Sequence, residues 1–293
     1  MCLKVKLCGV VNLHKPGGMS SRQAVDRVKR WVRPAKTGHA GTLDPLASGV
    51  LVVCVGAATR LIEYVQAMPK RYMGTFLLGR ESETEDVEGQ VRMLDDAPQP
   101  TDADLRAAAA RFVGQIEQRP PAFSALKVEG RRAYDLARAG KHVDLAPRRV
   151  TVYRLDVVRY NYPELVLEIE CGSGTYIRSL GRDLAASLGT AAVMSALVRT
   201  AIGSFEIANA WLPERLDRDN RTDWLETPLQ AVAALERVSL TAAEAERVRH
   251  GMAIGSASAE LAGEVAALNK DGELVAILRA DEDGTLRPVR NLV

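Results

Sequence analysis

Long hydrophobic runs, cysteines and net charge are all scarce in this sequence of 293 residues. No apolar run approaches the roughly 20 residues of a membrane-spanning helix. The stretch before Gly9 lacks the apolar segment and the small-residue cleavage site of a signal peptide, so we expect a cytoplasmic protein without a membrane anchor. The four cysteines stand far apart, with neither CxxC spacing nor a cluster of Cys and His, so nothing in the sequence indicates a zinc site.

The net charge of +2 by itself says nothing about a nucleic-acid partner, but the charges are unevenly distributed. Residues 20–36 hold six Lys or Arg against one acid, and residues 119–154 hold nine against three. Residues 80–96 reverse this balance, with seven acids against two bases. Segregated basic stretches can face phosphates, or they can be the solvated faces of ordinary helices and loops. Charge alone does not decide between the two.

One acidic residue, Asp44, stands in the glycine-rich stretch 38–49, which reads G-H-A-G-T-L-D-P-L-A-S-G. The apolar run at residues 50–55 follows directly and predicts a buried strand. Pro45 favours extended backbone geometry at Asp44, and a strand beside the turn would fix the carboxylate in place for chemistry. Taken alone, an Asp in such a turn is more often present for local hydrogen bonds.

The stretch around Asp44 is similar to the catalytic motif of the TruB family of tRNA pseudouridine synthases, G-H-T-G-T-L-D-P-L-A-T-G. Only Ala40 and Ser48 depart from that pattern, and both are small replacements. The resemblance continues in order over roughly residues 9–205, in K-P-G-G-M-S-S at 15–21, K-R-Y at 70–72, Q-R-P-P-A-F-S-A-L-K at 118–127, G-T-Y-I-R at 174–178 and L-V-R-T-A-I-G-S-F at 197–205. Phe123 stands where the family more often has Tyr. Thr84 and Asp86 fit two positions of the family's acidic segment, to which we assign no catalytic role.

The resemblance implies an α+β fold: the pseudouridine synthase fold, with a central mixed, largely antiparallel sheet flanked by helices. We expect this catalytic domain to span residues 1–235. From about residue 236 the composition changes, and Asn269–Gly272 between two strand-like stretches indicates a hairpin. We therefore expect residues 236–293 to form a small, mostly β domain, and the family suggests a PUA-like RNA-binding domain there.

The implied reaction is the isomerisation of uridine to pseudouridine at position 55, in the T loop of tRNA. Asp44 would be the nucleophile or the group that deprotonates C1′, and the sequence leaves both open. The target base must be flipped out of its loop before a side chain can reach it. The resemblance assigns supporting roles to five residues: Tyr72 stacks on the base, Arg178 keeps Asp44 ionised and oriented, Leu197 forms an apolar wall, His39 supports the flipped base, and Lys15 contacts phosphate or the active site.

The implied reaction needs no metal and no organic cofactor, because it involves neither redox change nor net transfer. We expect tRNA, through its T stem-loop, as the partner of a monomeric protein. One alternative is a non-catalytic RNA-binding or RNA-folding protein on the same scaffold, which would not need Asp44, Tyr72 and Arg178 together. A second is a hydrolase that uses Asp44 on a nucleoside or glycoside, but no matching motif holds a second carboxylate for the acid role.

Overall fold

The computed structural model describes residues 7–124, 126–128, 131–132, 134, 136, 145–255, 263–282 and 284–292. The chain forms two compact units. The first contains residues 1–44, 50–67 and 208–293, and the second contains residues 45–49 and 68–207.

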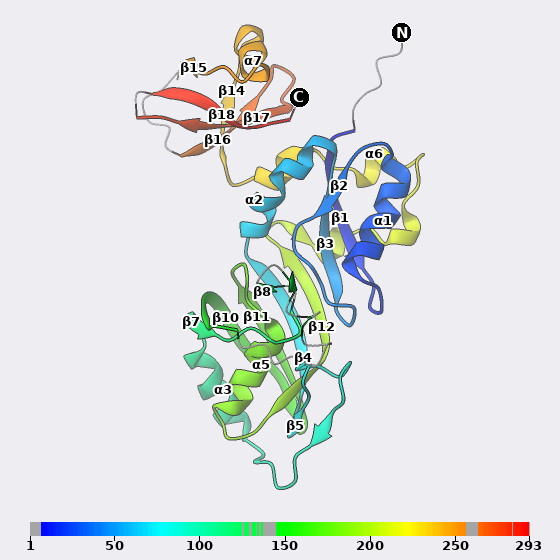
Figure 1. Cartoon of the computed structure of the whole chain (residues 1–293), viewed down its shortest axis with the longest axis vertical. Helices are drawn as coiled ribbons and strands as arrows, with labels where there is room; N and C mark the ends of the chain where they lie inside the picture. The colour runs from blue at the N-terminus through cyan, green and yellow to red at the C-terminus, as the bar shows by residue number, and fades with distance from the viewer. Residues whose placement is uncertain are drawn as a thin grey trace. The chain divides into compact units, whose positions relative to one another are not determined.

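The first unit begins with three strands and a helix that packs on them (Figure 1). Strand β3 (Ser48–Val55) lies between β1 (Gly9–Lys15) and β2 (Thr37–His39). Helix α1 (Ser21–Val32) begins where the sequence predicts, because the Ser20 side chain caps it in a capping box. Its predicted apolar stripe is buried against the strands.

The segment after β3 differs from the single helix that residues 57–66 predict. It forms a 3₁₀ helix, η1 (Gly56–Leu61), followed by the short helix α2 (Ile62–Ala67). Leu61 and Val65 are buried as the apolar stripe requires, so the periodicity identifies the packed face but not the tighter first turns. Helix η2 (Ile207–Asn209) spans the boundary between the two units, and the first unit continues with η3 (Pro213–Arg215), α6 (Arg221–Trp224) and η4 (Pro228–Val232).

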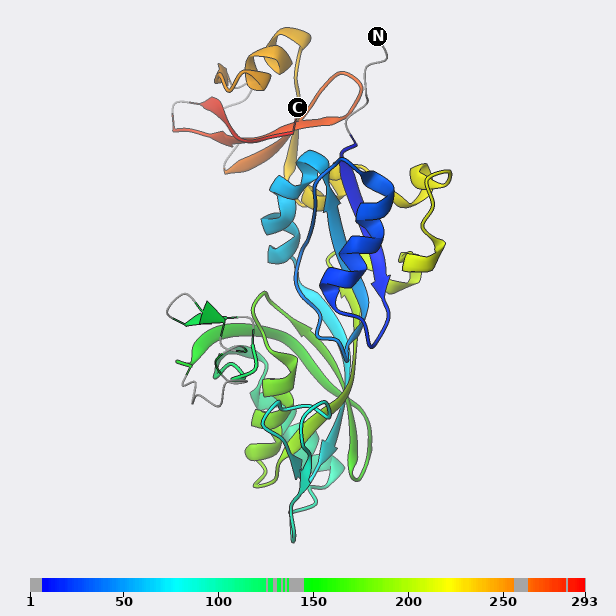
Figure 2. The ribbon, with the colours of Figure 1, turned by 45° about the vertical axis from the view of Figure 1, so that its right-hand side comes forward.

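The C-terminal part of the first unit is a five-stranded sheet, counted over the described residues, with helix α7 (Ala242–Arg249) packed beside it (Figure 2). Thr241 caps α7 in a capping box with Glu244. In sheet order the strands are β14 (Glu236–Ser239), β16 (Glu264–Leu268), β17 (Leu274–Ala280), β18 (Thr285–Asn291) and β15 (Ile254–Gly255). The hairpin predicted around Asn269 joins β16 to β17.

The second unit is built on a strongly hydrogen-bonded sheet. Its order is β12 (Ala192–Ile202), β4 (Lys70–Leu78), β11 (Glu164–Cys171), β10 (Arg148–Asn161) and β7 (Gly114–Gln118), each antiparallel to the next. Strand β13 (Phe205–Glu206) pairs antiparallel with β12. The first residues of β3, Ser48 and Gly49, pair in parallel with β12, and this pairing makes the sheet mixed.

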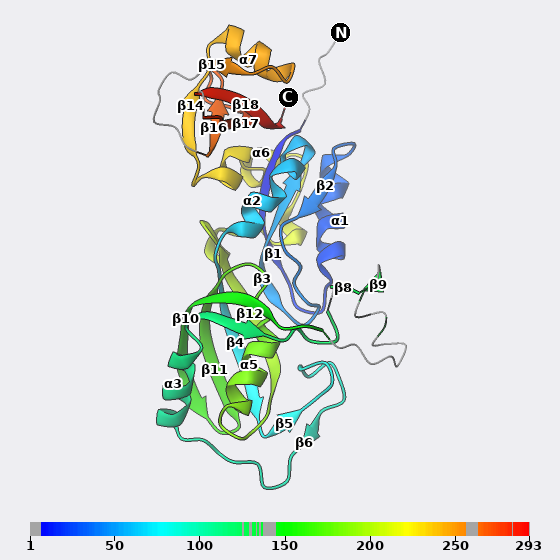
Figure 3. The ribbon, with the colours of Figure 1, turned by 60° about the vertical axis from the view of Figure 1, so that its left-hand side comes forward.

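Two helices of the second unit cover one face of this sheet, α3 (Asp102–Arg111) and α5 (Ile177–Ala186) (Figure 3). Gly181 of α5 lies so close to Phe76 of β4 that an added Cβ would stand 2.1 Å from the ring. Short two-residue strands occupy the connections: β5 (Arg80–Glu81), β6 (Arg92–Met93), β8 (Lys127–Val128) and β9 (Arg131–Arg132).

The predicted fold class is confirmed: an α+β chain with a mixed, largely antiparallel sheet and a small, mostly β C-terminal part. One local prediction is wrong. The sequence of Gly172–Thr175 is typical of a turn and a helix cap, but the N-cap of α5 is Tyr176, whose side chain makes no capping hydrogen bond within the described part of the chain. No helix among the described residues is long and apolar enough to cross a membrane.

Candidate active site

Asp44 lies half-buried in the irregular segment before β3, and the first residue of α1 anchors the residue next to it. The buried Ser21 hydroxyl accepts a hydrogen bond from the backbone N–H of Leu43 at 2.8 Å. The same hydroxyl donates to the Leu43 carbonyl at 2.9 Å. Both backbone groups of the residue before Asp44 are therefore satisfied by one side chain from another element, which restricts where the carboxylate can lie.

His39 and Lys15 belong to the same unit as Asp44. His39 is the last residue of β2, half-buried and opposite Val53 of β3. Lys15 ends β1 and is completely buried. Its ammonium donates to the carbonyls of Met19 at 2.6 Å and Pro16 at 3.0 Å, so it holds the turn that leads into α1. A contact between Lys15 and a phosphate stays a prediction.

Tyr72 and Leu197 lie on neighbouring strands of the second unit and share one face of its sheet. Tyr72 of β4 is paired with Arg199 of β12, and Leu197 stands two residues from Arg199 without an intervening bulge. Paired residues and residues two apart on a strand point to the same side of a sheet. Gly74, opposite Leu197, adds no side chain there. An aromatic and an aliphatic side chain, both buried, therefore share one face of the sheet with the buried Arg199.

Strand β12 also fixes the segment that follows Asp44. Gly49 has φ +106°, and an added Cβ would lie 2.2 Å from the Arg199 carbonyl oxygen. Only glycine allows both this backbone conformation and this close approach of the two strands. The motif glycine at this position is therefore required by packing against β12.

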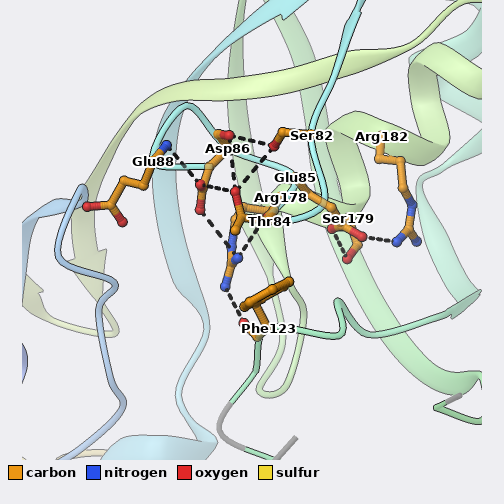
Figure 4. A network of polar contacts seen from close by, with 9 residues as sticks. All are labelled: Ser82, Thr84, Glu85, Asp86, Glu88, Phe123, Arg178, Ser179 and Arg182. Atoms are coloured by element: carbon orange, nitrogen blue, oxygen red, sulfur yellow. Dashed lines mark hydrogen bonds and ion pairs between the residues drawn. The ribbon is translucent and has the colours of Figure 1, made fainter. Parts of the chain in front are cut away.

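Arg178 lies in the first turn of α5, on the face of the sheet that carries Phe76, and is 7% exposed. Its guanidinium donates to the Thr84 carbonyl at 2.7 Å and to the Phe123 carbonyl at 3.1 Å (Figure 4). It also lies 3.3 Å from a carboxylate oxygen of Asp86. Several fixed acceptors thus determine the direction of the guanidinium plane.

Asp86 is itself held in place. Its Oδ1 accepts from the Thr84 hydroxyl at 2.6 Å and from the Glu88 backbone N–H at 3.1 Å. The Ser82 hydroxyl donates to the Asp86 carbonyl at 2.6 Å. The neighbouring Val87 N–H donates to a carbonyl of β12 at 3.0 Å, so the acidic loop 82–88 is fixed to the sheet. Because the loop is held by contacts that do not involve Arg178, it can fix the orientation of the Arg178 guanidinium.

The resemblance assigns no function to several residues that hold the Asp44 loop and the Arg178 guanidinium in place. Ser21 was predicted only as a possible helix cap, although its hydroxyl holds Leu43. The acidic segment received no catalytic role, although Thr84 and Asp86 orient Arg178. The only sequence signal for the second case was the fit of Thr84 and Asp86 to the family's pattern. Phe123 contributes its carbonyl, and its ring contacts Tyr134 edge-on at 6.2 Å between centroids.

One buried cation near Tyr72 has a perturbed pKa. Burial, and to a lesser extent the charge of nearby Arg199, lowers the pKa of Lys70 to about 8. Both side chains come from the paired ends of β4 and β12. Among the described residues, no group of three or more His, Cys, Asp or Glu side chains is placed to hold a metal ion.

The mixed sheet, its helices and the irregular aspartate loop before one of its strands define a pseudouridine synthase. Two family models match the chain: TruB family pseudouridylate synthase (N terminal domain) over residues 29–177, and tRNA pseudouridine synthase II, C terminal, over residues 235–293. The chain belongs to the TruB family, as the ordered motifs predict.

Curated relatives match almost the whole chain. The tRNA pseudouridine synthase B of Moorella thermoacetica is 38% identical over 289 residues, which cover 94% of each chain. The protein of that name from Arthrobacter sp. is 40% identical over 296 residues, covering 97% of this chain and 96% of the relative. The agreement therefore includes the C-terminal sheet as well as the motif-bearing part.

Solved structures agree in fold. A chain of the Cbf5-Nop10-Gar1 complex superposes with a TM-score of 0.72 at 26% identity, covering 94% of this chain and 79% of that one. A chain of an H/ACA RNP bound to a substrate RNA containing 2′-deoxyuridine gives a TM-score of 0.73 at 22% identity, covering 97% and 85%. The second likeness concerns the fold alone.

Proposed function

We propose that this protein isomerises uridine to pseudouridine in tRNA, at position 55 in the T loop. The observation that carries the proposal is the anchored aspartate loop: Asp44 stands beside a residue whose backbone is held by Ser21, within the family's catalytic motif. The nearly full-length similarity to curated tRNA pseudouridine synthases B supports the substrate class.

The reaction breaks the bond between C1′ and N1, rotates the uracil and joins C1′ to C5. The proton on C5 is then lost, and N1 ends protonated, so atoms and charge balance without an external reagent. Asp44 acts at C1′, as the nucleophile or as the base that removes its proton. A carboxylate serves either purpose only when it is aimed at C1′, and the hydrogen bonds that anchor Leu43 restrict where it can lie.

The remaining proposed residues serve the flipped base and the carboxylate. Tyr72 stacks on the uracil, and Leu197, on the same face of the sheet, forms the apolar wall beside it. Arg178 is the cation that we propose orients the Asp44 carboxylate during the reaction. His39 supports the flipped base from the motif loop, and Lys15 supports the site from beneath the turn at residues 16–19.

RNA recognition completes the proposal. The T stem-loop is bound through its shape and its phosphates, by a catalytic domain of residues 1–235 and a PUA-like RNA-binding domain of residues 236–293. The protein acts as a monomer in the cytoplasm, without a metal or an organic cofactor.

The test uses purified protein, Asp44→Ala and an unmodified tRNA transcript. Pseudouridine is mapped by carbodiimide treatment and reverse-transcription stops, and tRNA binding is measured in parallel. We expect a single stop in the T loop with the wild type, and none with Asp44→Ala, which still binds tRNA. Binding without pseudouridine from the wild type would leave an RNA-binding protein on this scaffold, whereas a stop elsewhere would overturn the assigned position.

A further inference from the structure

The helix that carries Arg178 begins without a cap of its own. Within the described residues, the N-cap Tyr176 makes no side-chain capping hydrogen bond, and the first turn contains no acid. The unpaired N–H groups and the positive end of the helix dipole favour negative charge near such a turn. Arg178 adds a full positive charge at the same place. Asp86 pairs with this guanidinium, and Gln118 accepts from the Tyr176 N–H at 2.8 Å, but a further carboxylate near the first turn would also be favourable.

Glu85 supplies a carboxylate to this helix from the acidic loop 82–88. Its side chain accepts a hydrogen bond from the Ser179 hydroxyl at 2.7 Å and forms an ion pair with Arg182. Ser179 directly follows Arg178 and is fully buried, and Arg182 lies nearly one turn later. Arg182 also donates to the Arg119 carbonyl at 2.9 Å. One carboxylate thus joins the first and second turns of α5 to the loop (Figure 4).

The backbone of Glu85 is strained in a way that serves this arrangement. Its φ of +61° lies in the left-handed region, which residues with a Cβ rarely adopt. The strain is maintained because its N–H donates to the Ser82 carbonyl at 3.1 Å, and its own carbonyl accepts from Met194 of β12 at 3.0 Å. In this conformation both sequence neighbours of Glu85 contact Arg178, while Glu85 itself contacts the helix that carries Arg178.

We propose that Glu85 is a positioning residue for Arg178: it holds the first turn of α5 through Ser179 and Arg182, and so fixes the guanidinium for the reaction. The proposal rests on the proposed function, in which Arg178 serves Asp44. Asp86 and Thr84 contact the Arg178 guanidinium directly, whereas Glu85 contacts the helix that carries Arg178.

The experiment compares Glu85→Gln with Glu83→Gln, which removes an exposed carboxylate from the same loop. Glu83 makes no ion pair or side-chain hydrogen bond in the described part of the chain, so it is a matched control. The single-turnover rate of pseudouridine formation, the Kd for tRNA and the Tm are measured for each. Because small displacements of a catalytic group are costly, we expect the rate to fall about tenfold in Glu85→Gln. Its Kd should stay within about twofold, and Glu83→Gln should match the wild type.

A double-mutant cycle tests whether Glu85 acts on Arg178 through its ion pair with Arg182. Glu85→Gln combined with Arg182→Gln should be no slower than the slower single variant, because both changes break one unit. Rate losses that add in the double variant would refute a positioning effect that acts through Arg182. A wild-type rate in Glu85→Gln, measured well below its Tm, would refute the positioning role itself.

A readout that needs no activity separates this inference from the proposed function. The Nε–H signal of Arg178 in ¹⁵N NMR, assigned by its absence in Arg178→Lys, reports the order of the guanidinium directly. We expect a sharp signal in the wild type and Glu83→Gln, and a broadened one in Glu85→Gln. An unchanged signal would overturn the inference even if the enzyme proves active, and a broadened one would support it even if the wild type makes no pseudouridine.

Discussion

Replacing Ser21 by Ala tests whether α1 holds the aspartate loop. The substitution keeps the helix but removes a hydroxyl that both accepts from and donates to the Leu43 backbone, at 2.8 and 2.9 Å. Ser21 and Leu43 are both buried, so water cannot readily replace the lost partner. Two buried backbone groups are left unsatisfied at about 1 kcal/mol or more each, and we expect the free energy of unfolding to fall by about 2–3 kcal/mol. Because Asp44 follows Leu43 directly, the single-turnover rate should also fall, by about tenfold.

The neighbouring Ser20→Ala variant is the control. Ser20 caps the same helix by accepting from the Gln23 N–H at 3.2 Å, but within the described residues its side chain makes no hydrogen bond to the aspartate loop. Its loss should cost about 1 kcal/mol of stability and leave the rate unchanged. Urea unfolding and single-turnover kinetics at 25 °C measure both effects. Equal rate losses in the two variants, or a wild-type rate in Ser21→Ala, would refute a positioning role for the Ser21 hydroxyl.

Two further predictions concern the strands next to the site. Gly49→Ala should lower the free energy of unfolding by about 3 kcal/mol in urea denaturation. Gly49 has φ +106°, and the added Cβ would lie 2.2 Å from the Arg199 carbonyl oxygen. A loss below about 1 kcal/mol would contradict this packing. Burial lowers the pKa of Lys70 to about 8 in the folded protein, from an ordinary value of 10.5. Between about pH 8 and pH 10.5 the Lys70 amine therefore binds more protons in the unfolded chain than in the folded one. The contribution of Lys70 to the free energy of unfolding rises with pH in that window. Lys70→Met should be more stable at pH 7 and should lack this rise in unfolding measurements across the window, and an unchanged slope would count against it.

Local patterns were sufficient to predict the elements that depend on neighbouring residues. Ser20 before an amphipathic stretch predicts α1, and the run after Asp44 predicts β3, because capping and burial periodicity operate over a few residues. The boundary between η1 and α2 was missed, since the same apolar stripe fits either kind of helix. The environment of Arg178 could not be predicted from such patterns: its contact with Thr84 joins residues 94 apart in sequence, and it depends on a left-handed Glu85 that no propensity favours.

The acidic segment 80–96 shows why a charge count can misjudge how strongly a segment repels phosphates. Residues 80–96 carry seven acids against two bases, a balance that would repel phosphates if every charge faced solvent. Asp86 is instead buried against Arg178, and the carboxylate of Glu85 is paired with Arg182. Those two acids offset two cations of α5 and exert little field at a distance. Glu81 is also paired, with Arg92, so fewer than the seven counted acids are left to repel phosphates, while Glu85 and Asp86 bear on where Arg178 points. An acidic segment is therefore compatible with an RNA-binding protein when its most deeply placed charges are balanced within the protein.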